Sequence, residues 1–177
     1  MNQGKERARV RRAGLGVALA ACGWLAAGCA ATGGGTTSAV VPASLAMSDL
    51  DGVRHDLDAE LAKGRAVTLV FWQTWCASCK AEAPALVRAA VAHADHMTFV
   101  GVVPGTDATV DDDEVRRVAS ELGLPYPTVR DRDLALTESF QVQGTPTIIV
   151  LEGSPARIVF AGHRPPSDFG AFGRAGL

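Results

Sequence analysis

The sequence predicts one α/β domain, because two kinds of hydrophobic pattern alternate along the chain. Residues 66–72 form a continuous apolar run, which is typical of a strand buried on both faces of a sheet. Residues 77–94 then place apolar side chains at helical spacing, with Pro84 expected to kink the helix because it removes one backbone donor. A second buried strand is expected over residues 98–103.

Turn signals, acidic caps and glycines predict the other elements. Residues 49–52 are a turn signal between two short extended segments. A helix is expected over 111–123, because acidic residues fill its first turn and Gly123 ends it. A short extended segment is expected near residue 128 and a short helix over 133–140. Two strands that form a hairpin are expected over 146–151 and 156–161. Residues 167–177 predict only a weak helix, because each of three glycines costs about 1 kcal/mol in a helix interior.

Composition places the chain among globular proteins. Of its 177 residues, 47% are hydrophobic and 20% are charged, and the formal net charge is −2. This balance excludes a disordered polyelectrolyte and a fibrous repeat. It also lacks the basic surplus of a nucleic-acid binder, so no nucleic-acid partner is expected. Four cysteines are too few for a disulfide scaffold of this size. We expect a monomer.

The N-terminal segment predicts export. Five basic residues and one acid precede the uncharged stretch 13–31, which is the order of a secretory signal. The residues Leu-Ala-Ala-Gly before Cys29 resemble a bacterial lipobox, which implies cleavage before Cys29 and lipidation of its thiol. Residues 19–22 form a competing lipobox that ends at Cys22, but its apolar core is shorter. Two further alternatives are a plain cleaved signal and an uncleaved anchor, since 13–31 is just long enough to span a bilayer.

These features divide the chain into three parts. Residues 1–28 are the expected lipoprotein-type signal peptide. Residues 29–43 are the expected flexible tether, because Gly, Ser and Thr predominate and no charge is present. Residues 44–177 are the expected folded domain. The domain would then be periplasmic or otherwise extracytoplasmic and held to the membrane by its lipid anchor.

Cys76 and Cys79 predict a redox site. They follow the strongest predicted strand and open the longest predicted helix, so the helix N-terminus would stabilise a thiolate at Cys76. Cys79 lies three residues on, on the same helix face, and can close a disulfide with Cys76. A purely structural disulfide is the first alternative, although so small a loop constrains the unfolded chain little. A zinc site with His93 and His96 is the second, although the spacing departs from that of a zinc finger.

Residues 63–84, which contain Trp-Cys-Ala-Ser-Cys, resemble the active-site block of the TlpA/ResA-like thioredoxin family. Members of that family are anchored, extracytoplasmic thiol–disulfide oxidoreductases. Residues 49–52 are similar to the family's N-terminal hairpin, and residues 133–147 to the stretch that leads into its cis-proline loop. The resemblance covers about residues 44–163. It implies a thioredoxin-like fold, with a central mixed sheet flanked by helices, an N-terminal hairpin and a central insertion over 104–132.

The resemblance also implies catalytic roles. Cys76 would be the attacking cysteine and Cys79 the resolving cysteine. Pro146 would be the cis-proline that faces them. Thr145 would offer backbone hydrogen bonds to a substrate chain.

Three further side chains and one departure complete the expected site. Glu82 stands where ResA-like proteins have a glutamate that tunes the pKa of the cysteines. Trp75 is expected to be exposed beside the first cysteine, where it would cover the site, whereas Trp72 is expected in the core. Thioredoxin has a buried aspartate where this chain has Val70, so Glu82 or water is left as the proton acceptor.

The expected activity is thiol–disulfide exchange with protein substrates, with no cofactor and no metal. Family analogy favours the reductive direction, as in cytochrome c maturation, with a membrane electron donor. The alternative function is a Sco-like copper-binding module on the same fold, with His163 as a third ligand. Those proteins space their two cysteines one residue further apart than Cys76 and Cys79.

Overall fold

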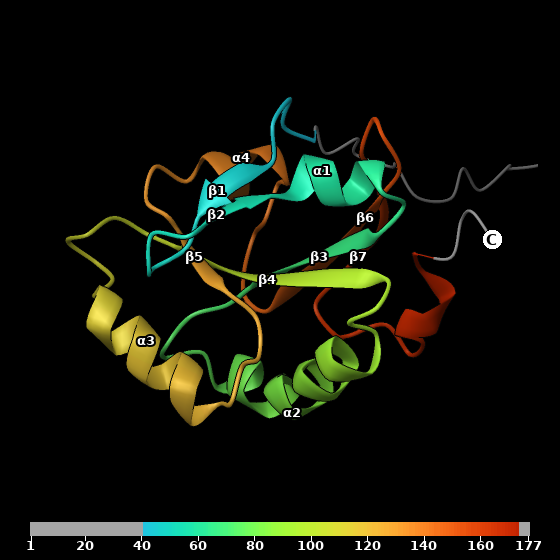
Figure 1. Ribbon diagram of the computed structural model, residues 1–177. Coiled ribbons are helices and arrows are strands. Elements are labelled where there is room, and N and C mark those ends of the chain that lie inside the picture. Colours follow the sequence, from blue (N-terminus) through green and yellow to red (C-terminus); the bar gives the residue numbers. More distant parts are fainter. Residues whose placement is uncertain (1–40, 174–177) are drawn as a thin grey trace, which may run out of the picture. The chain divides into compact units, whose positions relative to one another are not determined.

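A five-stranded mixed sheet forms the centre of the domain in the computed structural model, which describes residues 41–173 (Figure 1). The strands lie in the order β5-β4-β3-β6-β7. β3, β4 and β5 run parallel, whereas β6 pairs antiparallel with β3, and β7 antiparallel with β6. Their bounds are β3 Ala66–Phe71, β4 Met97–Pro104, β5 Thr128–Asp131, β6 Thr147–Glu152 and β7 Arg157–Gly162.

β3 is the central strand, and its sequence explains its position. All six of its residues are buried, as the continuous apolar run predicts. Its register pairs Val70 with Gly101 of β4 on one side and with Ile148 of β6 on the other. The C-terminal end of β3 therefore leads directly from the middle of the sheet to the two cysteines.

Within residues 41–173, four α-helices cover the two faces of the sheet. Figure 1 shows α1 and α4 on one face and α2 and α3 on the other. Their bounds are α1 Leu57–Ala62, α2 Ala77–Ala92, α3 Asp112–Glu121 and α4 Ala135–Ser139. α3 begins where its acidic cluster predicts, because the Asp111 side chain accepts a hydrogen bond of 2.8 Å from the Glu114 N–H. Its inner residues Val115 and Val118 pack with both cysteines.

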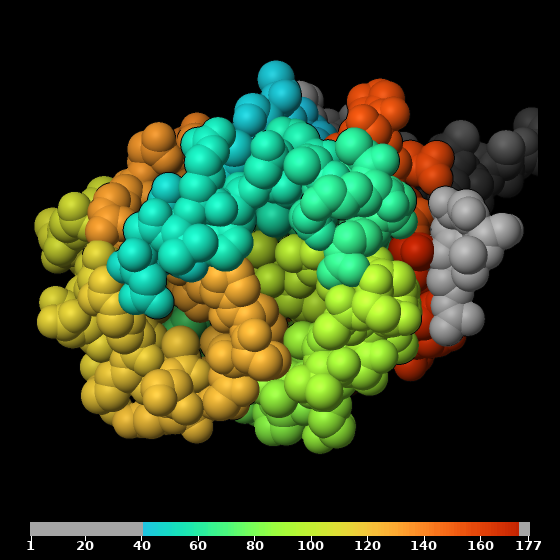
Figure 2. All heavy atoms as spheres, in the orientation of Figure 1, coloured from blue at the N-terminus to red at the C-terminus, as the bar shows by residue number. Residues whose placement is uncertain are grey.

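An N-terminal hairpin closes one side of the sheet. β1 (Ala46–Ser48) and β2 (Arg54–Asp56) pair antiparallel around the expected turn. The Leu50 N–H donates a 3.0 Å hydrogen bond to the carbonyl of Thr128 in β5, and Arg116 of α3 donates to the Leu50 carbonyl at 2.6 Å. The hairpin is therefore fixed both to the β5 edge and to α3. Figure 2 shows the hairpin and α1 as a continuous layer across this side of the domain.

Arg130 holds the segment between β4 and α3 in place. Its side chain is only 1% exposed and forms an ion pair with Asp112 at the start of α3. It also donates hydrogen bonds to the carbonyls of Gly105 and Val110, at 2.6 and 3.1 Å. A buried cation with this many acceptors fixes the connection that places α3 against the cysteines.

Three local features of the structure differ from what the sequence predicts. α1 was not expected; Asp56 caps it by accepting a hydrogen bond from the Ala59 N–H. α4 is shorter than 133–140, because Leu134 takes a left-handed conformation with φ of 61° just before it. The weak helix expected over 167–177 is, within the described residues, only the 3-10 turn Phe169–Ala171.

The expected signal peptide and most of the expected tether lie outside the described residues. Within residues 41–173, none of the helices has both the length and the apolar character needed to cross a bilayer.

Candidate active site

Cys76 sits at the N-terminus of α2, where the chain leaves β3. It is the N-cap residue, and its Sγ atom accepts a hydrogen bond of 3.1 Å from the Cys79 N–H. The Ser78 hydroxyl lies 3.4 Å from the same sulfur. These donors and the positive end of the helix dipole favour negative charge on Cys76 over negative charge on Cys79.

The two cysteines form a disulfide, with an S–S distance of 2.04 Å and a Cα–Cα distance of 5.2 Å. Each cysteine is 5% exposed. Cys76 is therefore less accessible than its position at a helix N-terminus suggests, because α3 and the loop before β6 pack around it.

The loop before β6 faces the first cysteine. The Thr145–Pro146 peptide bond is cis, as the resemblance implies, and the Thr145 carbonyl oxygen lies 3.5 Å from the Cys76 Sγ. His163, at the end of β7, donates a hydrogen bond from Nδ1 to the Pro146 carbonyl at 2.9 Å. Local sequence patterns do not predict this contact, because Pro146 directly precedes β6 and His163 directly follows β7, so only the pairing of the two strands brings them together.

The two tryptophans near the cysteines take opposite environments. Trp75 is 74% exposed, whereas Trp72 is 2% exposed and packs in the same cluster as both cysteines. Trp75 therefore offers an apolar surface beside the disulfide. Glu82 is half-buried on α2 and has no side-chain hydrogen bond or ion pair within residues 41–173.

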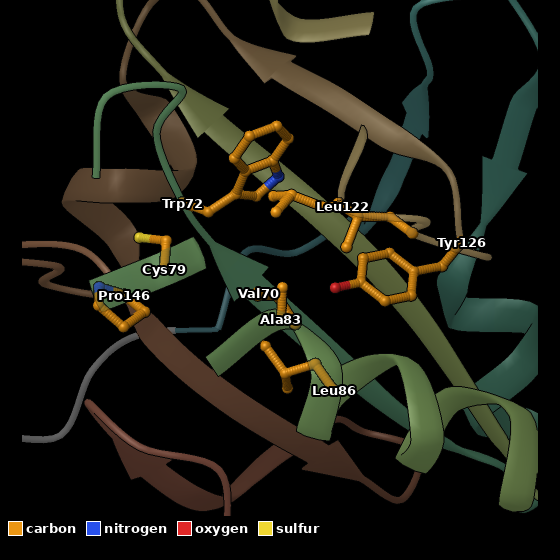
Figure 3. A pocket seen from close by; sticks show the side chains of 9 residues that line it. Val70, Trp72, Cys79, Ala83, Leu86, Leu122, Tyr126 and Pro146 are labelled. Carbon is orange, nitrogen blue, oxygen red and sulfur yellow. The ribbon is translucent and has the colours of Figure 1, made fainter. Parts of the chain in front are cut away.

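A narrow cavity lies behind Cys79, with a volume of about 10 Å³ (Figure 3). Its lining comes from β3, α2, the segment after α3 and the loop before β6: Val70, Trp72, Cys79, Ala83, Leu86, Leu122, Leu124, Tyr126 and Pro146. Most of these side chains are apolar. The exceptions are the Cys79 sulfur, the Trp72 indole and the Tyr126 hydroxyl, and burial raises the pKa of Tyr126. Sequence reasoning missed Tyr126.

The metal alternatives gain no support from the geometry. Cys76 caps the N-terminus of α2 and His93 caps its C-terminus, so the four residues of the zinc alternative divide between opposite ends of a 16-residue helix. Within residues 41–173, no three His, Cys, Asp or Glu side chains come together as a possible metal site. The Nδ1 atom of His163, the third residue of the copper alternative, is engaged by the Pro146 carbonyl.

Fold and site together define a thioredoxin-like protein with a CxxC disulfide at a helix N-terminus. The chain belongs to the Redoxin family, whose model matches residues 36–158. Among solved structures, StoA from Bacillus subtilis is 25% identical, with a TM-score of 0.60 over 72% of this chain and 92% of that chain. A secreted disulfide oxidoreductase of Mycobacterium tuberculosis has a TM-score of 0.57 at 23% identity, over 71% and 87% of the two chains. The expected thioredoxin-like fold is confirmed.

Two of the curated relatives are described as a thioredoxin-like protein and a thiol-disulfide oxidoreductase. The thioredoxin-like protein YneN of Bacillus subtilis is 33% identical over 51% of this chain and 52% of its own length. The thiol-disulfide oxidoreductase ResA of the same organism is 28% identical over 64% and 62%. The chain thus spans about half to two thirds of the length of these relatives.

Proposed function

We propose that this protein is a thiol–disulfide oxidoreductase that acts on protein substrates outside the cytoplasm. The observation that carries the proposal is the position of the Cys76 sulfur. It accepts a hydrogen bond from the Cys79 N–H at the start of α2 and lies 3.5 Å from the Thr145 carbonyl. This arrangement stabilises a thiolate next to backbone groups that a substrate chain can pair with.

Exchange in the reductive direction takes two steps. The Cys76 thiolate attacks one sulfur of a substrate disulfide, forms a mixed disulfide and releases the other substrate sulfur as a thiolate. Cys79, as a thiolate, then attacks the Cys76 sulfur. The Cys76–Cys79 disulfide forms, the second substrate thiolate leaves, and two electrons have passed to the substrate. Each leaving thiolate is protonated by solvent.

Four other residues take supporting roles in this proposal. The Thr145 backbone binds the extended substrate chain, with Pro146 fixing the loop that presents it. Trp75, at 74% exposure, packs on apolar substrate side chains. Glu82, half-buried one turn after Cys79, tunes the pKa of the cysteines. That role rests on the resemblance to ResA-like proteins.

The proposed direction is that of a reductant, in cytochrome c maturation or related redox maintenance, with a membrane electron donor. ResA and the soluble secreted antigen MPT53 of Mycobacterium bovis, which is 28% identical over 52% of this chain, support an extracytoplasmic location. We further propose that residues 1–28 are a lipoprotein signal, that Cys29 carries the lipid, and that residues 29–43 tether a monomeric domain over 44–177.

Two experiments on the full-length protein test the activity. In graded dithiol–disulfide buffers, alkylation and mass counting should show one two-electron transition, near or below about −250 mV for a reductant and near about −120 mV for an oxidant. In cells, Cys79→Ser should accumulate mixed disulfides with other proteins, and the matched variant Cys76→Ser should not. Failure of Cys76 and Cys79 to exchange at any potential would refute the proposal.

Metabolic labelling with a fatty acid tests the anchor. Cys29→Ala should abolish incorporation of label, whereas the control Cys22→Ala should leave it unchanged. The reverse result would assign the lipid to Cys22.

A further inference from the structure

The imidazole of His163 binds the carbonyl group that follows the cis peptide bond. Its Nδ1 atom lies 2.9 Å from the Pro146 carbonyl oxygen and 3.3 Å from the Thr147 hydroxyl oxygen. A carbonyl oxygen can only accept a hydrogen bond, so Nδ1 carries the proton and is the donor. The contact therefore fixes the tautomer of the ring, and in the neutral form Nε2 holds the lone pair.

This imidazole replaces a backbone hydrogen bond that the sheet lacks at this point. β6 and β7 pair with Ile148 opposite Gly162. In a continued ladder, the Pro146 carbonyl would next accept from the backbone N–H of Arg164. β7 ends at Gly162, however, and two prolines follow at 165–166. Within residues 41–173, the Arg164 N–H forms no backbone hydrogen bond with Pro146. The ring N–H supplies the missing donor.

The loop before β6 is thus held on both sides of Thr145. The Thr147 hydroxyl donates a 2.7 Å hydrogen bond to the Gly144 carbonyl, and the imidazole donates to the Pro146 carbonyl. Between these two points, the Thr145 carbonyl oxygen lies 3.5 Å from the Cys76 Sγ. A backbone that is already fixed loses less conformational entropy when a second chain pairs with it. These hydrogen bonds therefore prepare the backbone that a substrate chain would use.

We propose that His163 is a positioning residue for protein substrates of the exchange reaction. It holds the Pro146 carbonyl, and through it the Thr145 backbone, in the position with which a substrate chain pairs. A small disulfide has no such chain, so its reaction with Cys76 does not depend on the imidazole. His163 thus favours polypeptide substrates over small disulfides. This inference rests on the proposed exchange function.

Reduction of insulin by the full-length protein, with dithiothreitol as the electron donor, tests this role. His163→Ala removes the ring donor and should raise KM for insulin by about three- to tenfold, while kcat stays unchanged. His163 is exposed, so the substitution leaves no cavity in the core. Reduced protein also attacks an aromatic disulfide whose released thiolate absorbs visible light. The rate of that attack should stay within about twofold of the wild-type rate.

Two amide variants separate the hydrogen bond from the bulk of the ring. The side-chain nitrogen of asparagine is as many bonds from Cβ as Nδ1 of histidine, whereas the nitrogen of glutamine corresponds to Nε2. His163→Asn should therefore restore the wild-type KM for insulin, and His163→Gln should keep the raised KM. His93→Asn is the matched control, because His93 lies at the opposite end of α2 from Cys76. It should leave KM unchanged.

Different results refute the positioning role and the exchange function. The positioning role would be overturned by a wild-type KM in His163→Ala, by equal KM values in His163→Asn and His163→Gln, or by an equal slowing of the attack on the aromatic disulfide. A rise in KM of the same size in His93→Asn would also overturn it. If the wild-type protein reduced neither insulin nor the aromatic disulfide, the exchange function itself would be refuted.

Discussion

Gly101 is the position where one added methyl group would disturb the support of the active site most directly. It lies in the middle of β4, opposite Val70 and Thr128. A Cβ atom there would lie 2.9 Å from the Trp72 Nε1 and 3.0 Å from the Thr128 hydroxyl oxygen. Trp72 is only 2% exposed, so its ring cannot move aside into solvent. The added methyl group therefore overpacks the core beneath the cysteines.

The expected cost of Gly101→Ala follows from two opposing effects. Overpacking a core costs about 1–3 kcal/mol. Replacing glycine returns about 0.4–1 kcal/mol, because the unfolded chain loses freedom. We therefore expect the free energy of unfolding to fall by about 1–2 kcal/mol, which lowers Tm by about 3–8 °C.

Urea denaturation followed by circular dichroism measures this change. Gly144→Ala is the matched control, because Gly144 has no positive φ and nothing lies within 4 Å of its Cβ position. Its unfolding midpoint should equal that of the wild type or rise slightly. The reasoning would be refuted if Gly101→Ala were as stable as the wild type, or if Gly144→Ala lost as much stability.

Three further changes should each affect one property. Asp131→Ala should lower the free energy of unfolding in urea by about 2–4 kcal/mol, because the buried carboxylate accepts from the N–H and hydroxyl of Thr137 at 2.8 and 2.5 Å. Trp75→Ala should raise KM for a protein disulfide by about tenfold and change stability by less than about 0.5 kcal/mol. Burial opposes ionisation of Asp49, but hydrogen bonds from His55 and the backbone outweigh it and lower the pKa of Asp49. The carboxylate thus contributes stability above about pH 4, and the stability gap between wild type and Asp49→Asn should close as pH falls below that; a constant gap would contradict this reasoning.

The elements that the sequence predicts well are those with a local physical cause. β3 is a buried strand because all six of its residues are apolar or β-branched. α3 begins at Asp111 because that side chain caps it. α1 left only a weak signal in the sequence: Leu57 and Leu61 stand four residues apart after the capping residue Asp56, and both are buried. Its six residues are too few for periodicity to separate it from a loop.

The site divides in the same way between local and distant causes. Cys76 and Cys79 could be found from the chain alone, because helix start and sulfur spacing are local. Tyr126 and His163 could not. Tyr126 reaches the cavity behind Cys79 only because α3 returns the chain over β4, and His163 reaches the Pro146 carbonyl only across the β6–β7 hairpin. Such contacts depend on tertiary packing, and the spacing of residues along the sequence does not predict them.

The attachment of the N-terminal hairpin also limits how copies of this protein can meet. An outer strand with unpaired N–H and C=O groups is a template for a strand from another chain. In β5, the Thr128 carbonyl already accepts a hydrogen bond from the Leu50 N–H, and Val129 forms an antiparallel β-bridge with Asp49. A strand from a second molecule would have to displace this cover before it could extend the sheet. The hairpin thus protects molecules that are crowded together from aggregating along this edge.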